Sequence, residues 1–309
     1  MRVFVAGASG AIGRFLTPQL RDAGHEVIGM ARSVQRAREL EGGGAEAVVA
    51  DALDRDGVIA AVREARPDAV VHQLTAIPAA LNPKKFAQQF EQTNRLRTEG
   101  THNLLAASEA AGAGSVVAQS VAFMYDPIGD AVKDEDAPLY ADPPPEFRAP
   151  LEALLELERA VGESGGTVLR YGYFYGPGSS YASDGSIAHQ VRKRRFPIVG
   201  DGAGVFSFIH RRDAAQATVA AVERAGGGVF NIVDDEPAPV REWLPAYAAT
   251  LGAKPPRRVP KLIARLAAGS YAAGLMTELR GASNARAKEQ LGWRPGYASW
   301  REGFRDGLG

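Results

Sequence analysis

Short apolar runs, rich in β-branched and aromatic residues, alternate with longer helical patterns through the first half of this chain. Runs of this length are typical of buried strands, whereas apolar residues at helical spacing indicate an amphipathic helix. We predict strands at residues 2–6, 26–31, 45–50, 68–72, 115–119 and 167–171. We predict helices at 14–23, from near residue 54, at 93–112 and at 151–161. Strands that alternate with helices predict an α/β fold with a doubly wound parallel sheet.

The second half of the chain has a less regular pattern. Residues 126–150 contain six prolines and several acidic residues, which predicts a loop. Beyond residue 171 we expect a smaller C-terminal lobe, with short strands at 196–199, 206–210 and 229–232 and a helix at 214–224. The helix predicted at 151–161 is apolar around most of its circumference. A homodimer interface and a covered core helix would both produce that pattern.

A glycine turn separates the first strand from the first helix, at Gly7, Gly10 and Gly13. Glycine adopts tight turn torsions at little cost, and without a Cβ the main chain can approach a pyrophosphate at the positive end of the helix. Strand, turn and helix in this order form the context of a dinucleotide-binding fingerprint, although a plain glycine-rich turn would use the same residues. We therefore predict a Rossmann-type domain over mainly residues 1–170. Residues 171–309 form mainly the substrate lobe, and 205–235 return to the Rossmann core.

The end of the second strand bears on the choice of cofactor. Folds selective for NAD(H) commonly place an acidic residue there to hold the ribose hydroxyls. Here Arg32 and Ser33 follow the strand, and a cation with a hydroxyl suits a 2′-phosphate. We predict NADP(H) in preference to NAD(H), the alternative being that Arg32 is a surface residue. Asp51, after the third strand, would accept a hydrogen bond from the adenine amino group or cap the helix near Asp54.

Composition excludes several classes of function. The formal net charge is zero, so neither nucleic acid nor an anionic membrane is an expected partner. The chain has no cysteine, which excludes disulfides and thiolate catalysis, and we predict no metal site. No segment approaches the ~20 apolar residues of a membrane-spanning helix, and a first strand that begins at Arg2 leaves no room for a signal peptide. We expect a cytoplasmic protein that acts on a small molecule.

Further motifs follow the glycine turn in a fixed order: Asn94 before Gly100-Thr101, Tyr175-Gly176-Pro177-Gly178, Phe208-Ile209-His210 with Asp213, and Leu291-Gly292-Trp293-Arg294-Pro295. Together with the turn and Asp51, they resemble the extended short-chain dehydrogenases/reductases, the group of the NAD-dependent epimerases and dehydratases. The resemblance covers nearly the whole chain. It implies a nicotinamide cofactor and a catalytic Ser-Tyr-Lys set.

The chain departs from that set. The family's serine or threonine follows the fifth strand, which matches Ser120. The family's Tyr-x-x-x-Lys pair begins the next long helix, eight residues before a glutamate. Counting back from Glu158 places Pro150 and Leu154 at these two positions, and no lysine occurs between residues 133 and 193. Without the pair, the proton for a reduction comes from elsewhere, such as water or a substrate hydroxyl, or the protein binds the cofactor without chemistry.

Other side chains are candidates for the missing chemistry. Thr75 and Ser120 lie at the carboxyl ends of strands and would orient a carbonyl. Tyr125 and Tyr173 are candidate proton donors, with a pocket-wall role as the alternative for Tyr125. Phe123, Met124, Tyr173 and Phe206 predict an apolar, aromatic wall suited to a small organic molecule. The predicted substrate contacts are Phe123, Met124, Tyr125 and Phe206. Residues 204–207 lack the arginine with which nucleotide-sugar members hold a diphosphate, which disfavours a sugar nucleotide.

The predicted cofactor contacts come from the glycine turn, the strand ends and the motifs that follow them: Gly7, Ser9, Gly10, Ala11, Ile12, Gly13, Arg32, Ser33, Asp51, Ala52, Leu74, Thr75, Asn94, Ser120, Tyr171 and Tyr173. These assignments favour an atypical NADPH-dependent ketoreductase acting on a hydrophobic, polycyclic aromatic carbonyl compound. Two alternative hypotheses are a sugar-nucleotide epimerase or dehydratase and a non-catalytic NADP(H)-binding or redox-sensing protein.

Overall fold

Seven parallel strands form the central sheet of the structure, a computed structural model that describes residues 1–78, 82, 85–224 and 226–309. The strand order is β12-β7-β5-β4-β1-β2-β3. Their bounds are β1 (Arg2–Ala6), β2 (Glu26–Ala31), β3 (Glu46–Val49), β4 (Ala69–His72), β5 (Ser115–Val121), β7 (Thr167–Tyr171) and β12 (Gly228–Ile232). The order reverses between β1 and β4, and in such sheets ligands bind at the carboxyl ends of the strands beside this reversal. The predicted doubly wound α/β fold is confirmed.

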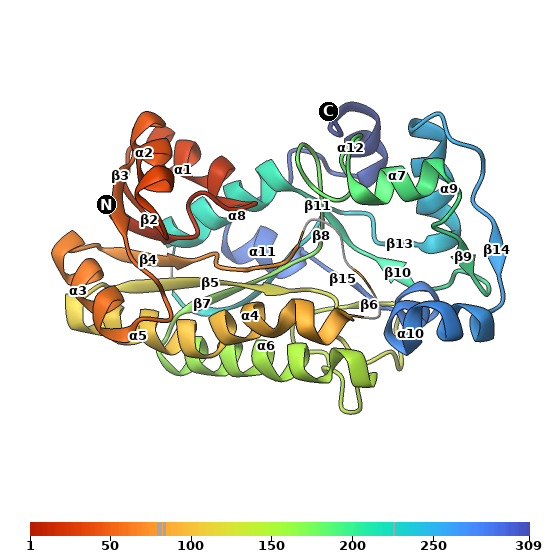
Figure 1. Ribbon diagram of the computed structural model, residues 1–309, viewed down its shortest axis with the longest axis horizontal. Helices are drawn as coiled ribbons and strands as arrows, with labels where there is room; N and C mark the ends of the chain where they lie inside the picture. Colours follow the sequence, from red (N-terminus) through yellow and green to blue (C-terminus); the bar gives the residue numbers. More distant parts are fainter. Residues whose placement is uncertain (79–81, 83–84, 225) are drawn as a thin grey trace.

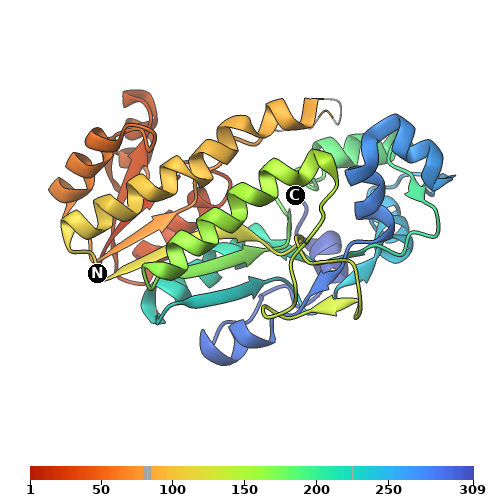
Figure 2. The ribbon, with the colours of Figure 1, turned by 90° about the horizontal axis from the view of Figure 1, so that it is seen from below.

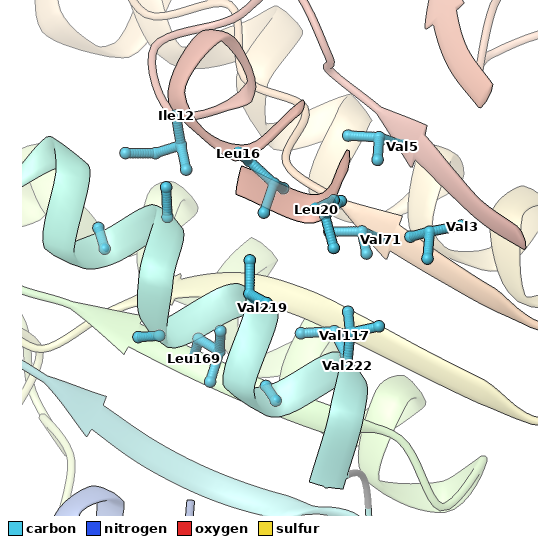
Figure 3. Packing of buried hydrophobic residues seen from close by; sticks show 14 of the residues in the cluster. Val3, Val5, Ile12, Leu16, Leu20, Val71, Val117, Leu169, Val219 and Val222 are labelled. Carbon is cyan, nitrogen blue, oxygen red and sulfur yellow. The ribbon is translucent and has the colours of Figure 1, made fainter. Parts of the chain in front are cut away.

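Helices cover both faces of the sheet (Figure 1). One face carries α1 (Gly13–Asp22), α2 (Val34–Gly42), α8 (Arg211–Arg224) and α11 (Ala285–Gln290). The other carries α3 (Arg55–Ala65), α4 (Phe86–Arg97), α5 (Glu99–Ala111) and α6 (Pro145–Glu163). Figure 3 shows Leu16 and Leu20 of α1 packed with Val219 of α8 over the valines of the sheet. Each such buried side chain contributes roughly 1.5–3 kcal/mol, and together they fix α1 and its glycine turn on the sheet.

A smaller lobe lies at the carboxyl ends of the strands. The chain enters this lobe directly from the sheet, because a single residue separates the end of β7 from the start of β8. Its elements are β6 (Val132–Lys133), β8 (Tyr173–Tyr175), α7 (Ser186–Arg192), β9 (Ile198–Val199), β10 (Val205–Phe206), β11 (Phe208–His210), β13 (Ala238–Pro239), α9 (Val240–Thr250), β14 (Arg258–Val259), α10 (Lys261–Thr277), β15 (Gly281–Ala282) and α12 (Trp300–Asp306). Its strands pair two by two. The lobe packs around aromatic rings such as Phe208 and Trp243, whose centroids are 5.2 Å apart.

The structure corrects three predicted boundaries. Helix α6 begins at Pro145, so the loop predicted over 126–150 is wrong in its last residues. A proline in the first turn of a helix is tolerated because its missing N–H would have no partner there. The helix predicted at 93–112 is two helices that meet at Thr98, whose φ and ψ are −97° and −82°. Strand β5 extends to Val121, which places Ser120 within the strand rather than after it.

The apolar pattern at 151–161 is explained within one chain. Four of its large residues are each at most 2% exposed: Leu151, Leu154, Leu157 and Val161. They pack on the sheet and against an apolar cluster at the end of α6. Leu155, at 37%, is the large apolar residue of this stretch that is exposed. The helix is therefore a covered core helix, and a homodimer stays a prediction.

Candidate cofactor and substrate site

The glycine turn between β1 and α1 has a conformation that side chains at its glycines would prevent. Gly7 has a φ of +99°, and a Cβ there would lie 2.8 Å from the Gln73 carbonyl oxygen. A Cβ at Gly13 would lie 2.2 Å from the carbonyl oxygen of Gly7. Helix α1 begins after Ile12 with no side-chain cap and no acidic residue in its first turn. Its first N–H groups and its positive end therefore fit the pyrophosphate of a dinucleotide.

Helix α8 brings a second positive charge to this turn, one that sequence reasoning missed. Arg211 is 2% exposed, and its guanidinium donates hydrogen bonds to the carbonyl oxygens of Ala11 and Pro177. Burial, together with the nearby positive charge of Arg14, lowers the pKa of Arg211 to about 10. Within the described part of the chain no carboxylate forms a salt bridge with Arg211. An anionic pyrophosphate would supply the missing counter-charge. In the sequence, only an arginine pair after the Phe208–His210 motif marks this position.

The predicted adenosine contacts lie along the ends of β2 and β3. Arg32 is exposed, and no described residue forms a salt bridge with it. Ser33 caps α2, since its Oγ accepts a hydrogen bond from the Arg36 N–H at 3.3 Å. The exposed Asp51 accepts from the Leu53 N–H at 3.0 Å. Its alternative role as a helix cap is wrong.

The cap of α3 is Asp54, whose carboxylate accepts from the Gly57 N–H at 3.2 Å. Asp51 is thereby left at the strand end for the predicted contact with adenine. Its neighbour Ala52 is 1% exposed, and the Ala52 carbonyl accepts from the Asn103 side chain at 2.8 Å. Ala52 therefore serves the packing between β3 and α5 in this structure.

Two buried acceptors near the end of β4 have no hydrogen-bond donor among the described residues: Gln73 Oε1 and Asn94 Oδ1. An unsatisfied buried acceptor costs roughly 1–3 kcal/mol, so a ligand that donates here would be stabilised. Leu74 and Thr75 follow directly and are half-buried. The cofactor contacts of this stretch stay a prediction.

The role predicted for Tyr171 is corrected. Its side chain is 1% exposed in the core between the sheet and α8. Its hydroxyl accepts from Gln73 Nε2 at 3.0 Å and lies 2.6 Å from Thr218 Oγ1. The Tyr171 hydroxyl therefore positions the Gln73 side chain through a hydrogen bond, and the Tyr171 side chain itself is not exposed to a cofactor.

Three of the predicted wall residues come together as an aromatic stack. The Tyr173 ring stacks on Phe123 at 4.6 Å and lies 4.5 Å from Phe206. The Tyr173 hydroxyl is buried without a hydrogen-bond partner among the described residues. Burial raises the pKa of Tyr173 well above its usual value, which makes this phenol a weaker acid. Met124 lies elsewhere: it is fully buried among the apolar residues at the end of α6, so its predicted place at the substrate surface is wrong.

Ser120 and Tyr125 belong to a buried polar network rather than to this wall. Ser120 Oγ donates to Glu158 at 2.6 Å, and Glu158 forms a salt bridge of 2.6 Å with Arg170. Tyr125 accepts from Arg170 at 3.0 Å and donates to Asn231 at 2.7 Å. Burial raises the pKa of Tyr125. Both hydroxyl protons are thus donated within the protein, and the catalytic roles predicted for Ser120 and Tyr125 are corrected to structural ones.

Helix α6 contains neither a tyrosine nor a lysine. Pro150 is buried, and Leu154 packs against Leu151 and Tyr271 in the apolar cluster at this end of α6. The arrangement holds no group that exchanges a proton at these two positions. Hydride transfer mainly requires that cofactor and substrate be positioned, and the turn, the strand ends and the aromatic stack are the predicted sites for that positioning.

Searches of the described residues find no cluster that could hold a metal ion and no helix long and apolar enough to span a membrane. The chain belongs to the NAD-dependent epimerase/dehydratase family, whose family model matches residues 3–233. It is 50% identical to the 3-diazoavenalumate denitrifying reductase of a Streptomyces species, over 98% of this chain and 99% of that protein.

Solved structures of the same fold extend over the whole chain. UDP-glucose 4-epimerase of Thermus thermophilus in complex with NAD has a TM-score of 0.75 at 25% identity, covering 100% of this chain and 98% of that one. A human epimerase family protein with NADPH has a TM-score of 0.75 at 23% identity, covering 100% and 99%. With its family and its relatives, the chain is an NAD(P)-dependent oxidoreductase of the short-chain dehydrogenase/reductase type.

Proposed function

We propose that the protein is an NADPH-dependent reductase that removes the diazo group of a small aromatic acid as N2. One combination carries the proposal: 50% identity to a denitrifying reductase of a diazo acid, in a chain whose α6 lacks both tyrosine and lysine. A reduction that takes no proton from the protein accounts for both observations.

Hydride addition to an aryldiazonium group is such a reduction. Bound NADPH supplies the hydride. The hydride forms a bond to the terminal nitrogen, and one N–N π pair moves to the positively charged inner nitrogen. The product is the neutral aryldiazene Ar–N=N–H, which loses N2 to leave Ar–H. Hydrogen and electrons balance without a proton from a protein side chain. Leu154, at the position of the family's lysine, also places no positive charge there that would repel the cationic diazonium.

The chain's own residues would hold the ring and keep water away from it. The stack of Phe123, Tyr173 and Phe206 offers an aromatic face to a flat substrate. With its raised pKa, the Tyr173 phenol keeps its proton and stays neutral. Thr75 is half-buried after β4, its hydroxyl forms no hydrogen bond with a described residue, and it would position a polar substituent.

A second candidate function is reduction of an aromatic ketone, with the proton from water or a substrate hydroxyl. The observation that favours it is the same apolar stack, which suits a polycyclic ketone equally well. A sugar-nucleotide epimerase is not favoured, because residues 204–207 carry no cation for a diphosphate and α6 carries no proton-transfer pair.

The test pairs two matched acids. The protein is incubated with NADPH and either a diazotised amino-hydroxybenzoate or the acetyl-hydroxybenzoate with its ketone at the same ring position. NADPH oxidation is followed by absorbance and N2 release by mass spectrometry with isotope-labelled diazo nitrogen. We expect one N2 for each NADPH oxidised and little ketone reduction. Turnover of the ketone alone would favour the second candidate, and turnover of neither would contradict both.

The proposal includes a preference for NADP(H), supported by the unpaired Arg32. Substituting Arg32→Ala removes a charge-assisted contact to the 2′-phosphate, so the KM for NADPH should rise about tenfold or more. The KM for NADH should hardly change. Arg63→Ala, an exposed arginine near the C-terminal end of α3, is the matched control and should leave both values unchanged. Equal effects of Arg32→Ala on both cofactors would overturn the preference.

A further inference from the structure

Arg97 is a buried cation without a counter-charge. It is the last residue of α4 and is 4% exposed. Its Nε has no hydrogen-bond partner, and no salt bridge to its guanidinium occurs anywhere in the described residues. Isolated charges are rarely buried, because removal from water is expensive unless a partner compensates. Burial lowers the pKa of Arg97 to about 10, which still leaves it charged at neutral pH.

The surroundings place this charge at the ligand side of the sheet. Arg97 interacts electrostatically with His72, the last residue of β4, and with Tyr271 of α10. Tyr271 is 8% exposed, stacks on Phe147 of α6 at 4.5 Å and packs in the same cluster as Leu154. Helices α4 and α6 run side by side here, as Figure 2 shows. The guanidinium therefore lies near the carboxyl end of β4, next to the cluster that replaces the family's lysine.

The protein does not supply an anion for Arg97 from this region. Glu146 is the carboxylate that links α6 to α10, and its two oxygens accept from the backbone N–H and the hydroxyl of Ser270 at 2.9 and 2.7 Å. Glu158, further along α6, is taken by Arg170. The Tyr271 phenol stays neutral because burial raises its pKa. No described carboxylate therefore balances the charge of Arg97.

We propose that Arg97, with the neutral Tyr271 phenol beside it, binds the carboxylate of an aromatic acid substrate. This rests on the proposed function and adds the group by which the substrate is recognised. An arginine pairs with a carboxylate through two parallel hydrogen bonds, so it fixes direction as well as position. The acid end lies at Arg97, and the opposite end of the ring is directed away from this cation. That orientation keeps a positively charged diazonium apart from the guanidinium.

The test compares Arg97→Met and Arg97→Lys with Arg95→Met. Methionine keeps the length of the side chain and removes its charge. Arg95 is exposed, lies two residues away and forms an ordinary surface salt bridge with Glu99 at 2.8 Å, so it is the matched control. KM and kcat are measured with the diazotised amino-hydroxybenzoate and with its methyl ester, which lacks the anion. NADPH affinity and the melting temperature are measured for each variant.

We expect Arg97→Met to raise the KM for the acid about tenfold to hundredfold and to leave the KM for the ester unchanged. Arg97→Lys should restore part of the loss, since lysine keeps the charge but not the paired geometry. NADPH affinity should not change, and the melting temperature should stay level or rise because an uncompensated charge has left the interior. Arg95→Met should leave all of these values unchanged.

Other results would overturn the proposal. An equal loss for acid and ester would assign Arg97 to the shape of the pocket, and a weaker affinity for NADPH would assign it to the cofactor. A lower melting temperature would make its role structural. If the wild-type protein turns over neither compound, the proposed function fails, but calorimetric titration of the NADP-loaded protein with hydroxybenzoate still tests Arg97. Equal affinities of wild type and Arg97→Met in that titration would reject the site.

Discussion

Two arginines of this protein are almost equally buried but differ in their partners: Arg170 forms an ion pair, and Arg97 forms none with a described residue. Arg170 is 5% exposed and Arg97 is 4% exposed. Arg170 donates to both oxygens of Glu158 at 2.9 and 2.6 Å, and also to Tyr125. Burial alone would lower its pKa, but the bonds to Glu158 raise it. Arg97 has no such partner, and its pKa is lowered to about 10.

The difference separates a charge that is paired within the protein, Arg170, from a charge that is available to pair with a ligand, Arg97. Every nitrogen of the Arg170 guanidinium donates a hydrogen bond within the protein, to Glu158, Tyr125 or Glu135, so it links α6 to the sheet and has no unpaired nitrogen left for a substrate. The region of Arg97 carries an uncompensated charge, and strained or unsatisfied groups of this kind gather at functional sites. Ser120 and Tyr125 belong to the region in which the charge is paired, and Arg97 is the residue that we propose for the site.

The largest expected effect is on stability and comes from Arg170→Met. It leaves the Glu158 carboxylate buried without its partner, and breaking a buried pair costs roughly 3–5 kcal/mol. Arg97→Met, the same substitution at the same burial, should cost nothing or stabilise the protein. Urea unfolding monitored by circular dichroism gives both free energies of unfolding. Similar losses of unfolding free energy in the two variants would contradict the distinction between a paired and an unpaired buried arginine.

A smaller effect concerns pH, through His72. Burial lowers the pKa of His72 to about 4, and the charge of Arg97 contributes. The folded state then binds fewer protons than the unfolded state between about pH 4 and 6.5, so stability present above pH 6.5 is lost as pH falls through this window. The loss from this residue is at most about 3 kcal/mol. His72→Gln should flatten the dependence of the unfolding free energy on pH.

The pKa of His72 also reports on the position of the Arg97 guanidinium. In Arg97→Met the like charge beside His72 is gone, so the pKa of His72 should rise while the overall fold is kept. The pKa is measured by NMR titration of the imidazole. An unchanged value would mean that the Arg97 guanidinium lies too far from β4 to serve the ligand side of the sheet.

The smallest expected effect is that of Ser120→Ala. The change removes one hydrogen bond to Glu158, which keeps both bonds to Arg170, so the cost should be about 1 kcal/mol. Reductase activity should stay within about twofold, a change in the barrier of well under 1 kcal/mol. A loss of activity of a hundredfold or more, with normal stability, would return Ser120 to the catalytic role that the sequence favoured.

Local patterns made most of the fold predictable. The predicted bounds of the strands at 26–31 and 167–171 agree with those of β2 and β7, because short, mainly apolar runs are a local signal. The glycine turn was equally predictable. A Cβ at Gly13 would clash with carbonyl oxygens of the turn itself, and a Cβ at Gly7 would clash with Gln73, which follows the neighbouring strand β4. The start of α6 was missed because prolines usually indicate loops, and the break at Thr98 has no breaker residue to mark it.

The site was less predictable because it depends on partners that are distant in sequence. Ser120 and Glu158 are 38 positions apart, and nothing near Ser120 indicates that its hydroxyl is already bonded. Arg211 reaches Ala11 across 200 positions. The defining property of Arg97 is that no described carboxylate pairs with it, which no local pattern can reveal. Arg95 and Arg97 look alike in sequence, yet one forms an exposed salt bridge and the other is buried alone.

The most direct test is a crystal structure of the protein with NADP and a hydroxybenzoate, with one distance as its result: that between the Arg97 guanidinium and the nearest anionic oxygen. We predict the carboxylate of the acid at about 2.7–2.9 Å, in a paired arrangement with two of the guanidinium nitrogens. An acid bound elsewhere, with Arg97 held by the cofactor or by a carboxylate of the chain itself, would contradict the account.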